Sequence, residues 1–331
     1  MVGQTDRGLT SEGAIEIKTA KSLPTYSAVL PKYKVLSETT AVLDGRKVKV
    51  RVKAYPPDNY LVEAITDVTN VFSLEHNQLR DRLLALAEKR LRQLDVLEGF
   101  KEEYTIFAIS GYRGEPKQFL KHARAIVGLI RSENLPLSEE EVTETINNSR
   151  LQYTAHDLTI LDWDGAFCFD PKADWHETIE LLEVANVHLL RLRVLDQELD
   201  RRLGGMAQLL QSVAKRNLSS SKVRKQMAAL MNLQVRSIEE FAHSGRDIQL
   251  IGDWYAAKLY SLISRKFHLP EWRHTLRTEL DNLRDLYQTA ADHFGISAQT
   301  RAEFIEIALW IILAIGYVAI FFLDMQKAIG G

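Results

Sequence analysis

Two short clusters of histidine or acidic residues, and a single cysteine, have side chains that metal or acid–base chemistry uses. His176 and Glu177 begin the HExxH pattern, in which two histidines one helical turn apart bind zinc and the glutamate acts as a base. Glu180 stands where the second histidine is required. We therefore expect an acidic helix start that complements the helix dipole, and no zinc site.

The second cluster and the single cysteine also lack the residues that a metal site or a reactive site would need. Asp162, Asp164 and Gly165 resemble the opening of a calcium loop, but apolar residues follow and no glutamate closes the loop, so a tight turn is expected. Cys168 is the single cysteine and lies among aromatic residues, where burial would raise its pKa and leave it inert. His188 falls on an apolar helix seam and is expected to be packed. No Walker-type phosphate loop is present either.

Because the zinc, calcium and phosphate-loop motifs are all incomplete or missing, the sequence predicts a protein without catalytic, cofactor-binding or metal-binding residues. We therefore expect a non-enzymatic protein, and no small-molecule substrate is identified. The formal net charge of −2 over 331 residues gives no global attraction to nucleic acid. The one local candidate is a basic face on a predicted strand, formed by Lys47, Lys49, Arg51 and Lys53. It is either a solvated strand face or a contact for an anionic surface such as RNA or lipid headgroups.

The elements that carry this face predict an α+β domain over residues 34–170, preceded by a mobile arm over 1–33. Asp44 and Gly45 suit a type I′ turn, after which Val48, Val50 and Val52 alternate with the basic residues. Helical spacing follows over 73–97, 116–133 and 138–147, with strands over 104–109 and 151–169. This order predicts a mainly antiparallel sheet with helices on one face.

Residues 171–302 are predicted to form a helical stalk domain, either a long-helix bundle or a coiled-coil-like hairpin. A helix starting near Asp174 extends towards Val213, and Gly204-Gly205 is a possible kink within it. The last helix of this domain has an apolar seam that includes Leu276, Leu280, Leu283 and Tyr287. Such seams favour self-association, so we expect a homo-oligomer.

The segment from Phe304 to Leu323 is apolar apart from Glu306. Twenty helical residues are roughly 30 Å long, which matches the hydrocarbon core of a bilayer. A buried core helix is the alternative. We predict a tail anchor over 303–324 and a short tail over 325–331, with Arg301, Glu303, Phe304 and Glu306 at the membrane entry. Because the N-terminal residues lack an apolar signal region, the body is expected to be cytoplasmic and the anchor to lie in the inner membrane, or the mitochondrial inner membrane in a eukaryote.

The order of these parts resembles the family of mitochondrial "required for meiotic nuclear division" proteins and their YagE-like microbial relatives. The resemblance covers roughly residues 104–322 and rests on four local matches. These are the long helix DWHETIELLEVANVHLLRLRVLDQELDRRL, a Leu218-Ser219 helix start with Val223, the pairs Trp254-Tyr255 and Leu259-Tyr260, and the entry Arg301, Glu303, Phe304. It implies a membrane-anchored, non-enzymatic protein that acts by assembly, and mitochondrial members support translation.

Two functional hypotheses follow. The first is a membrane-anchored scaffold that self-associates through its helices and holds a partner at the membrane lipid. The alternative is a ribosome or RNA tether that uses the basic strand face, whose binding would weaken steeply with salt. A pore is disfavoured because the sequence has one apolar span without polar lining residues, and no motif supports an enzyme.

Overall fold

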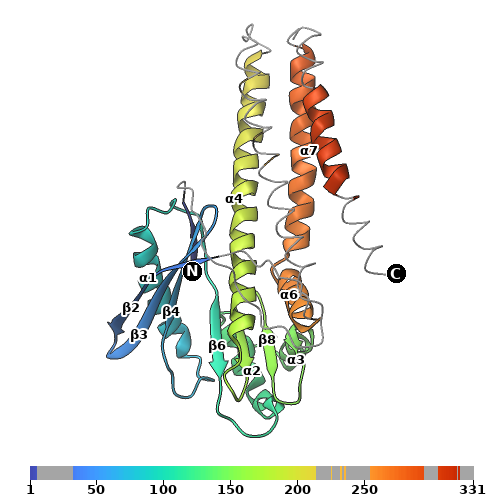
Figure 1. Ribbon diagram of the computed structural model, residues 1–331. Helices are drawn as coiled ribbons and strands as arrows, with labels where there is room; N and C mark the ends of the chain where they lie inside the picture. The colour runs from blue at the N-terminus through green and yellow to red at the C-terminus, as the bar shows by residue number, and fades with distance from the viewer. Residues whose placement is uncertain are drawn as a thin grey trace. The chain divides into compact units, whose positions relative to one another are not determined.

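The computed structural model describes residues 1–5, 33–213, 225, 232, 235, 254–293, 305–318 and 320 (Figure 1). The contacts divide the chain into two compact units. The first contains Met1–Leu199 and Val235–Arg277, and the second contains Asp200–Gln234 and Thr278–Gly331. The two sheets and the helices that cover them belong to the first unit.

The first sheet is antiparallel and has the strand order β2-β3-β4-β1-β5. Its strands are β1 (Val2–Gln4), β2 (Lys34–Leu43), β3 (Arg46–Tyr55), β4 (Asn59–Ile65) and β5 (Lys101–Glu102). Asp44 and Gly45 link β2 to β3 with φ of 50° and 75°, as a type I′ turn requires, so the predicted hairpin is confirmed. Helix α1 (His76–Arg92) packs on this sheet, and Ala87 and Leu91 join its valine-rich core.

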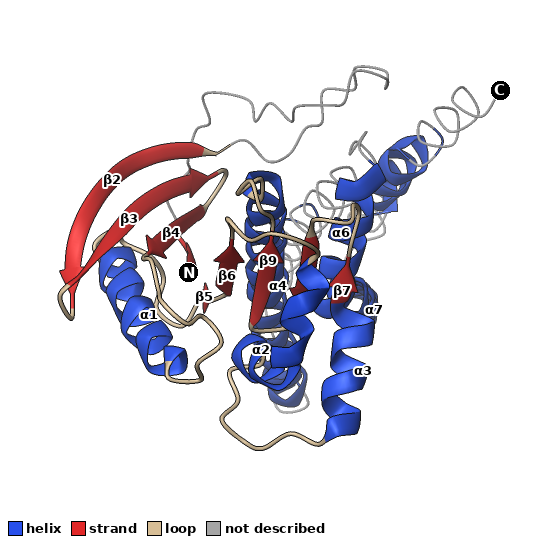
Figure 2. Cartoon of the chain, turned by 90° about the horizontal axis from the view of Figure 1, so that it is seen from below, coloured by secondary structure: helices blue, strands red, loops and turns tan. Residues whose placement is uncertain are grey.

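The second sheet has the order β6-β9-β8-β7 and lies beside α2 and α3 (Figure 2). Its strands are β6 (Thr105–Ile109), β7 (Arg150–Leu151), β8 (Leu158–Leu161) and β9 (Gly165–Phe169). β6 pairs with β9 in parallel, while the other pairs are antiparallel. A short 3₁₀ helix η1 (Pro116–His122) leads into α2 (Ala123–Ile130), and α3 (Glu139–Ser149) follows. These helices bury an aromatic core in which Phe107, Phe167 and Phe169 take part.

Three further helices with described bounds are α4 (His176–Val213), α6 (Trp254–Lys266) and α7 (Leu269–His293). Helix α4 continues through Gly204 and Gly205 without a break. Its N-terminal half has buried residues on every face because it passes through the interior of the first unit. Leu181, Ala185 and His188 are all buried there, and His188 is the residue that the sequence placed on an apolar helix seam.

Two sequence predictions are corrected here. The arm predicted over 1–33 contains β1, which pairs with β4 and β5, while residues 6–32 lie outside the described part. Within the described residues, no helix combines the length and apolarity needed to cross a membrane. The predicted transmembrane anchor over 303–324 and the inner-membrane location, including the mitochondrial alternative, are therefore wrong.

Candidate functional site

A cavity of about 690 Å³ lies within the first unit, and we call it the central cavity. Its wall is formed by β4 and α1 on one side and by β6 and α4 on the other. Most of the wall is apolar, and its polar side chains include Glu63 of β4 and Glu183 and Asn186 of α4. Its volume falls in the range of small-molecule sites in proteins.

Beside this cavity, a lysine and a glutamate form a buried ion pair between β3 and α4. The Lys53 Nζ atom donates to both carboxylate oxygens of Glu183, at 2.7 and 2.8 Å. The Tyr55 hydroxyl donates to the same carboxylate at 2.8 Å. Lys53 is 1% exposed and Glu183 is 6% exposed, so both charges lie away from water. Such a pair is stable only while both partners are present.

The network continues along the sheet through Glu63. This carboxylate lies 3.4 Å from Lys53 Nζ, and Arg51 donates to it at 3.1 Å. Burial opposes ionisation of Glu63, but Lys53, a hydrogen bond from Glu183 and Arg51 outweigh it and lower its pKa. Arg51 also pairs with Glu38 at 3.0 Å. Most of the basic strand face is thus neutralised within the chain.

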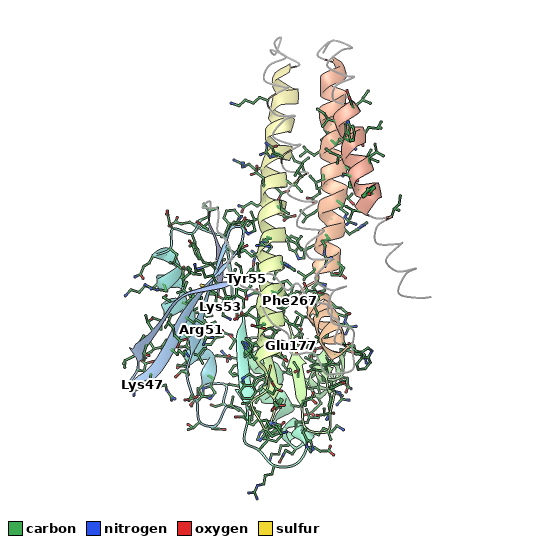
Figure 3. All side chains as sticks on the ribbon, in the orientation of Figure 1. Lys47, Arg51, Lys53, Tyr55, Glu177 and Phe267 are labelled. Carbon is green, nitrogen blue, oxygen red and sulfur yellow. The ribbon has the colours of Figure 1, made fainter. Side chains whose placement is uncertain are left out.

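The strand alternation explains this arrangement. Valines of β3 face the α1 side, so the basic residues face the other side of the sheet. Figure 3 shows Lys47 at one end of β3 and Lys53 near α4. Lys47 remains exposed, but α4 covers the end of the face that carries Lys53. The expectation that Lys53 belongs to a solvated or anion-binding face is therefore wrong.

Lys49 pairs with Glu38 at 2.7 Å, and its side chain is 43% exposed. An RNA contact through this face would depend mainly on Lys47 and Lys49, because the Arg51 guanidinium is paired with Glu38 and Glu63. The RNA tether stays a prediction. Fewer unpaired positive charges on this strand face are available for RNA than the sequence suggested.

Burial makes Glu183 the titratable group of this network. Removal from water raises its pKa from 4.5 to about 7, although Lys53 pulls it down. Between these two values the folded chain holds a proton that the unfolded chain has lost. The free energy of unfolding should therefore fall as the pH rises through this window, by at most about 1.4 kcal/mol per pH unit.

Denaturant unfolding across that pH window tests this expectation. Glu183→Gln cannot lose the proton, so its unfolding free energy should depend less on pH than that of the unchanged chain. Equal pH slopes for both proteins would show that Glu183 keeps its ordinary pKa.

A second polar side chain of α4 lines the central cavity one turn further on. Asn186 is 4% exposed and borders the cavity. Within the described part of the chain, no side-chain hydrogen bond joins its amide to another residue. A polar group in the cavity would be able to form a hydrogen bond with this amide.

Arg191 of α4 forms hydrogen bonds with the turn between β3 and β4. The sequence did not identify this residue as important. Its guanidinium donates to the Asn59 side chain at 2.6 Å and to the Pro56 carbonyl at 2.5 Å. Asp58 lies 3.6 Å away. Together with Lys53, this contact fixes α4 against the first sheet.

The clusters considered from the sequence have structural roles. Asp162 accepts a hydrogen bond from Arg131 at 3.1 Å. Burial raises the pKa of Cys168 to about 12, as expected for a core thiol. His188 is fully buried beside the Tyr260 hydroxyl at 2.8 Å. In the described ranges, no group of three or more histidine, cysteine or acidic residues is placed to hold a metal ion.

The predicted helix seam lies on α7. Leu276, Leu280 and Leu283 are buried within a single chain, and Tyr287 lies on the same helix, where its side chain is outside the described part. Self-association through these leucines would require them to leave their present cover. Of the predicted membrane-entry residues, Arg301, Glu303 and Phe304 lie outside the described residues, and Glu306 is exposed.

The fold and the cavity define an α+β protein with two sheets and a long helix that borders a partly charged cavity. Residues 18–175 match the sequence family described as "Uncharacterized protein MJ0711, N-terminal domain". The chain is also similar to the uncharacterized protein MJ0711 of Methanocaldococcus jannaschii, with 26% identity over 294 residues that cover 88% of this chain and 87% of that protein. No solved structure matches significantly. These similarities do not bear on the resemblance to the "required for meiotic nuclear division" family, which stays a prediction.

Proposed function

We propose that the protein is a non-enzymatic scaffold that self-associates through the apolar helix at residues 305–320. One observation carries this proposal: large apolar side chains are exposed along the described residues of this helix. They are Ile305, Ile307, Leu309, Trp310, Ile312, Leu313, Ile315, Tyr317, Val318 and Ile320. Trp310 is 66% exposed and Tyr317 is 77% exposed.

The distribution of these side chains favours a second copy of the same chain as the partner. Successive residues of a helix are about 100° apart, so ten positions over this stretch cover its full circumference. A groove on one unrelated protein would cover a single face. A symmetric bundle of identical helices covers several faces at once and buries each helix equally. Exposed apolar surface of this extent marks an interaction site.

The charge of the helix supports the same partner. Glu306 is the one charged residue between 305 and 320. A nucleic acid or a strongly charged protein would find no complementary surface there. Identical apolar helices need no charge complementarity, because burial of apolar area supplies the free energy at roughly 25 cal/mol per Å².

The mass of the full chain in solution, measured by light scattering after gel filtration, tests the proposal. We expect a multiple of the 37.7 kDa chain mass. The double variant Trp310→Glu, Leu313→Glu should shift the mass to that of a single chain, because two charges would be buried at the contact. Leu135→Glu is the matched control, since Leu135 is 75% exposed in the first unit.

An unchanged mass in the double variant, or a single-chain mass for the unchanged protein, would overturn the proposed scaffold. A loss of the oligomer in the Leu135 control would place the contact in the first unit instead.

A further inference from the structure

The central cavity has carboxylates on its wall and their cationic partners behind it. Glu63 and Glu183 line the cavity. Lys53 and Arg51, which pair with them, are not among the described residues that line it. A molecule in the cavity would therefore meet the carboxylate side of these ion pairs.

The remaining charges of the wall do not reverse this sign. Asp67 adds a third carboxylate, and Arg80 adds one guanidinium, which pairs with Asp81 at 2.8 Å. The amino group of Met1 also borders the cavity, and it donates to the Val62 carbonyl at 3.0 Å. Burial lowers the pKa of this amino group and so disfavours its positive charge.

Asn186 supplies an independent sign of a ligand. Asn186 is 4% exposed. It borders the cavity three residues after Glu183, on the same face of α4. Across the described residues, nothing within the chain satisfies its amide. Its carbonyl oxygen is a suitable acceptor for an N–H group that also faces Glu183.

The rest of the wall suits an apolar body. Leu79 and Leu83 of α1 face the cavity together with Ile106 of β6 and Ile179 of α4. Trp175, just before α4, also borders it, and an indole ring attracts a cation placed over its face. The wall thus offers apolar contact along most of its area and negative charge at the α4 and β4 side.

We propose that the central cavity binds a small organic cation, with its ammonium or guanidinium group between Glu183, Glu63 and the Asn186 carbonyl and its apolar body against α1 and β6. This site is independent of the proposed self-association, because it lies wholly within the first unit.

Calorimetric titration of the full chain with three probes of matched size tests this site. The probes are 2-phenylethylammonium, the neutral 2-phenylethanol and the anionic 3-phenylpropanoate. We expect the ammonium to bind and the other two to bind at least about tenfold more weakly, since a charge-assisted hydrogen bond accounts for at least a factor of that size.

Asn186→Leu should weaken ammonium binding roughly tenfold, because it removes the acceptor while keeping the volume. Asn148→Leu is the matched control, since Asn148 is exposed on α3. Denaturant unfolding of each variant verifies that the fold is intact. Equal binding of the three probes, no binding of the ammonium to the unchanged chain, or full binding by a folded Asn186→Leu protein would overturn the proposal.

Discussion

Replacing Lys53 with methionine should lower the free energy of unfolding by about 3–5 kcal/mol at a pH above 7. The change removes the ammonium that Glu183 and Glu63 share, and it leaves the 6%-exposed Glu183 carboxylate without its ion-pair partner. Tyr55 would still donate one hydrogen bond to Glu183, but it carries no compensating charge. Denaturant unfolding, followed by far-ultraviolet circular dichroism, measures the loss.

Two controls separate charge burial from loss of packing. Lys49→Met removes a lysine of the same strand whose side chain is 43% exposed, and it should change stability by less than about 1 kcal/mol. The double change Lys53→Met, Glu183→Leu removes both charges and should recover most of the lost stability. A small effect of Lys53→Met, or no recovery in the double variant, would contradict the role given to the ion pair.

The cost of Lys53→Met should also depend on pH. Because the pKa of Glu183 is raised to about 7 by burial, this carboxyl group is protonated at lower pH and then needs no cation. The difference in unfolding free energy between the variant and the unchanged chain should therefore shrink as the pH falls.

The second large effect is expected for Phe167→Ala, with a loss of about 3–5 kcal/mol. Phe167 is fully buried in β9 at the centre of the aromatic core of the second sheet. Its ring stacks on Phe107 at 4.7 Å and on Phe169 at 5.8 Å between centroids. Truncation leaves a cavity among rings that cannot collapse into it.

Tyr153→Ala is the matched control for this aromatic truncation. Tyr153 is 60% exposed, although its ring lies 5.1 Å from that of Tyr255. Its replacement should cost well under half as much as that of Phe167. Similar losses for the two variants in denaturant unfolding would show that the second sheet does not depend on the Phe167 core.

Features set by neighbouring residues could be predicted from the sequence. The Asp44-Gly45 turn and the alternation of β3 depend on local backbone preference and on strand periodicity. The helices that became α1, α3, α4 and α7 follow the spacing of apolar residues. The predicted helix over 116–133 begins as a 3₁₀ turn before α2, which apolar spacing alone does not distinguish.

Features set by distant residues could not be predicted. Lys53 meets Glu183 across 130 positions of sequence, so its burial cannot be seen from the alternation of its own strand. The central cavity likewise joins β4, α1, β6 and α4, none of which carries a recognisable binding motif. The apolar run at 304–323 met the local criteria for a membrane span, but no helix within the described residues has the length and apolarity to cross a membrane.

The position of β1 has a consequence for the order of events during synthesis. Val2 pairs with Leu61 of β4 and with Glu102 of β5, so this strand is the bridge between segments that leave the ribosome much later. The β2–β3 hairpin has its partners close in sequence and can form while the nascent chain is still short. The first sheet can therefore be complete only after residue 102 has been synthesised. Strand β1 is made first, but it can pair on both of its edges only at that late stage.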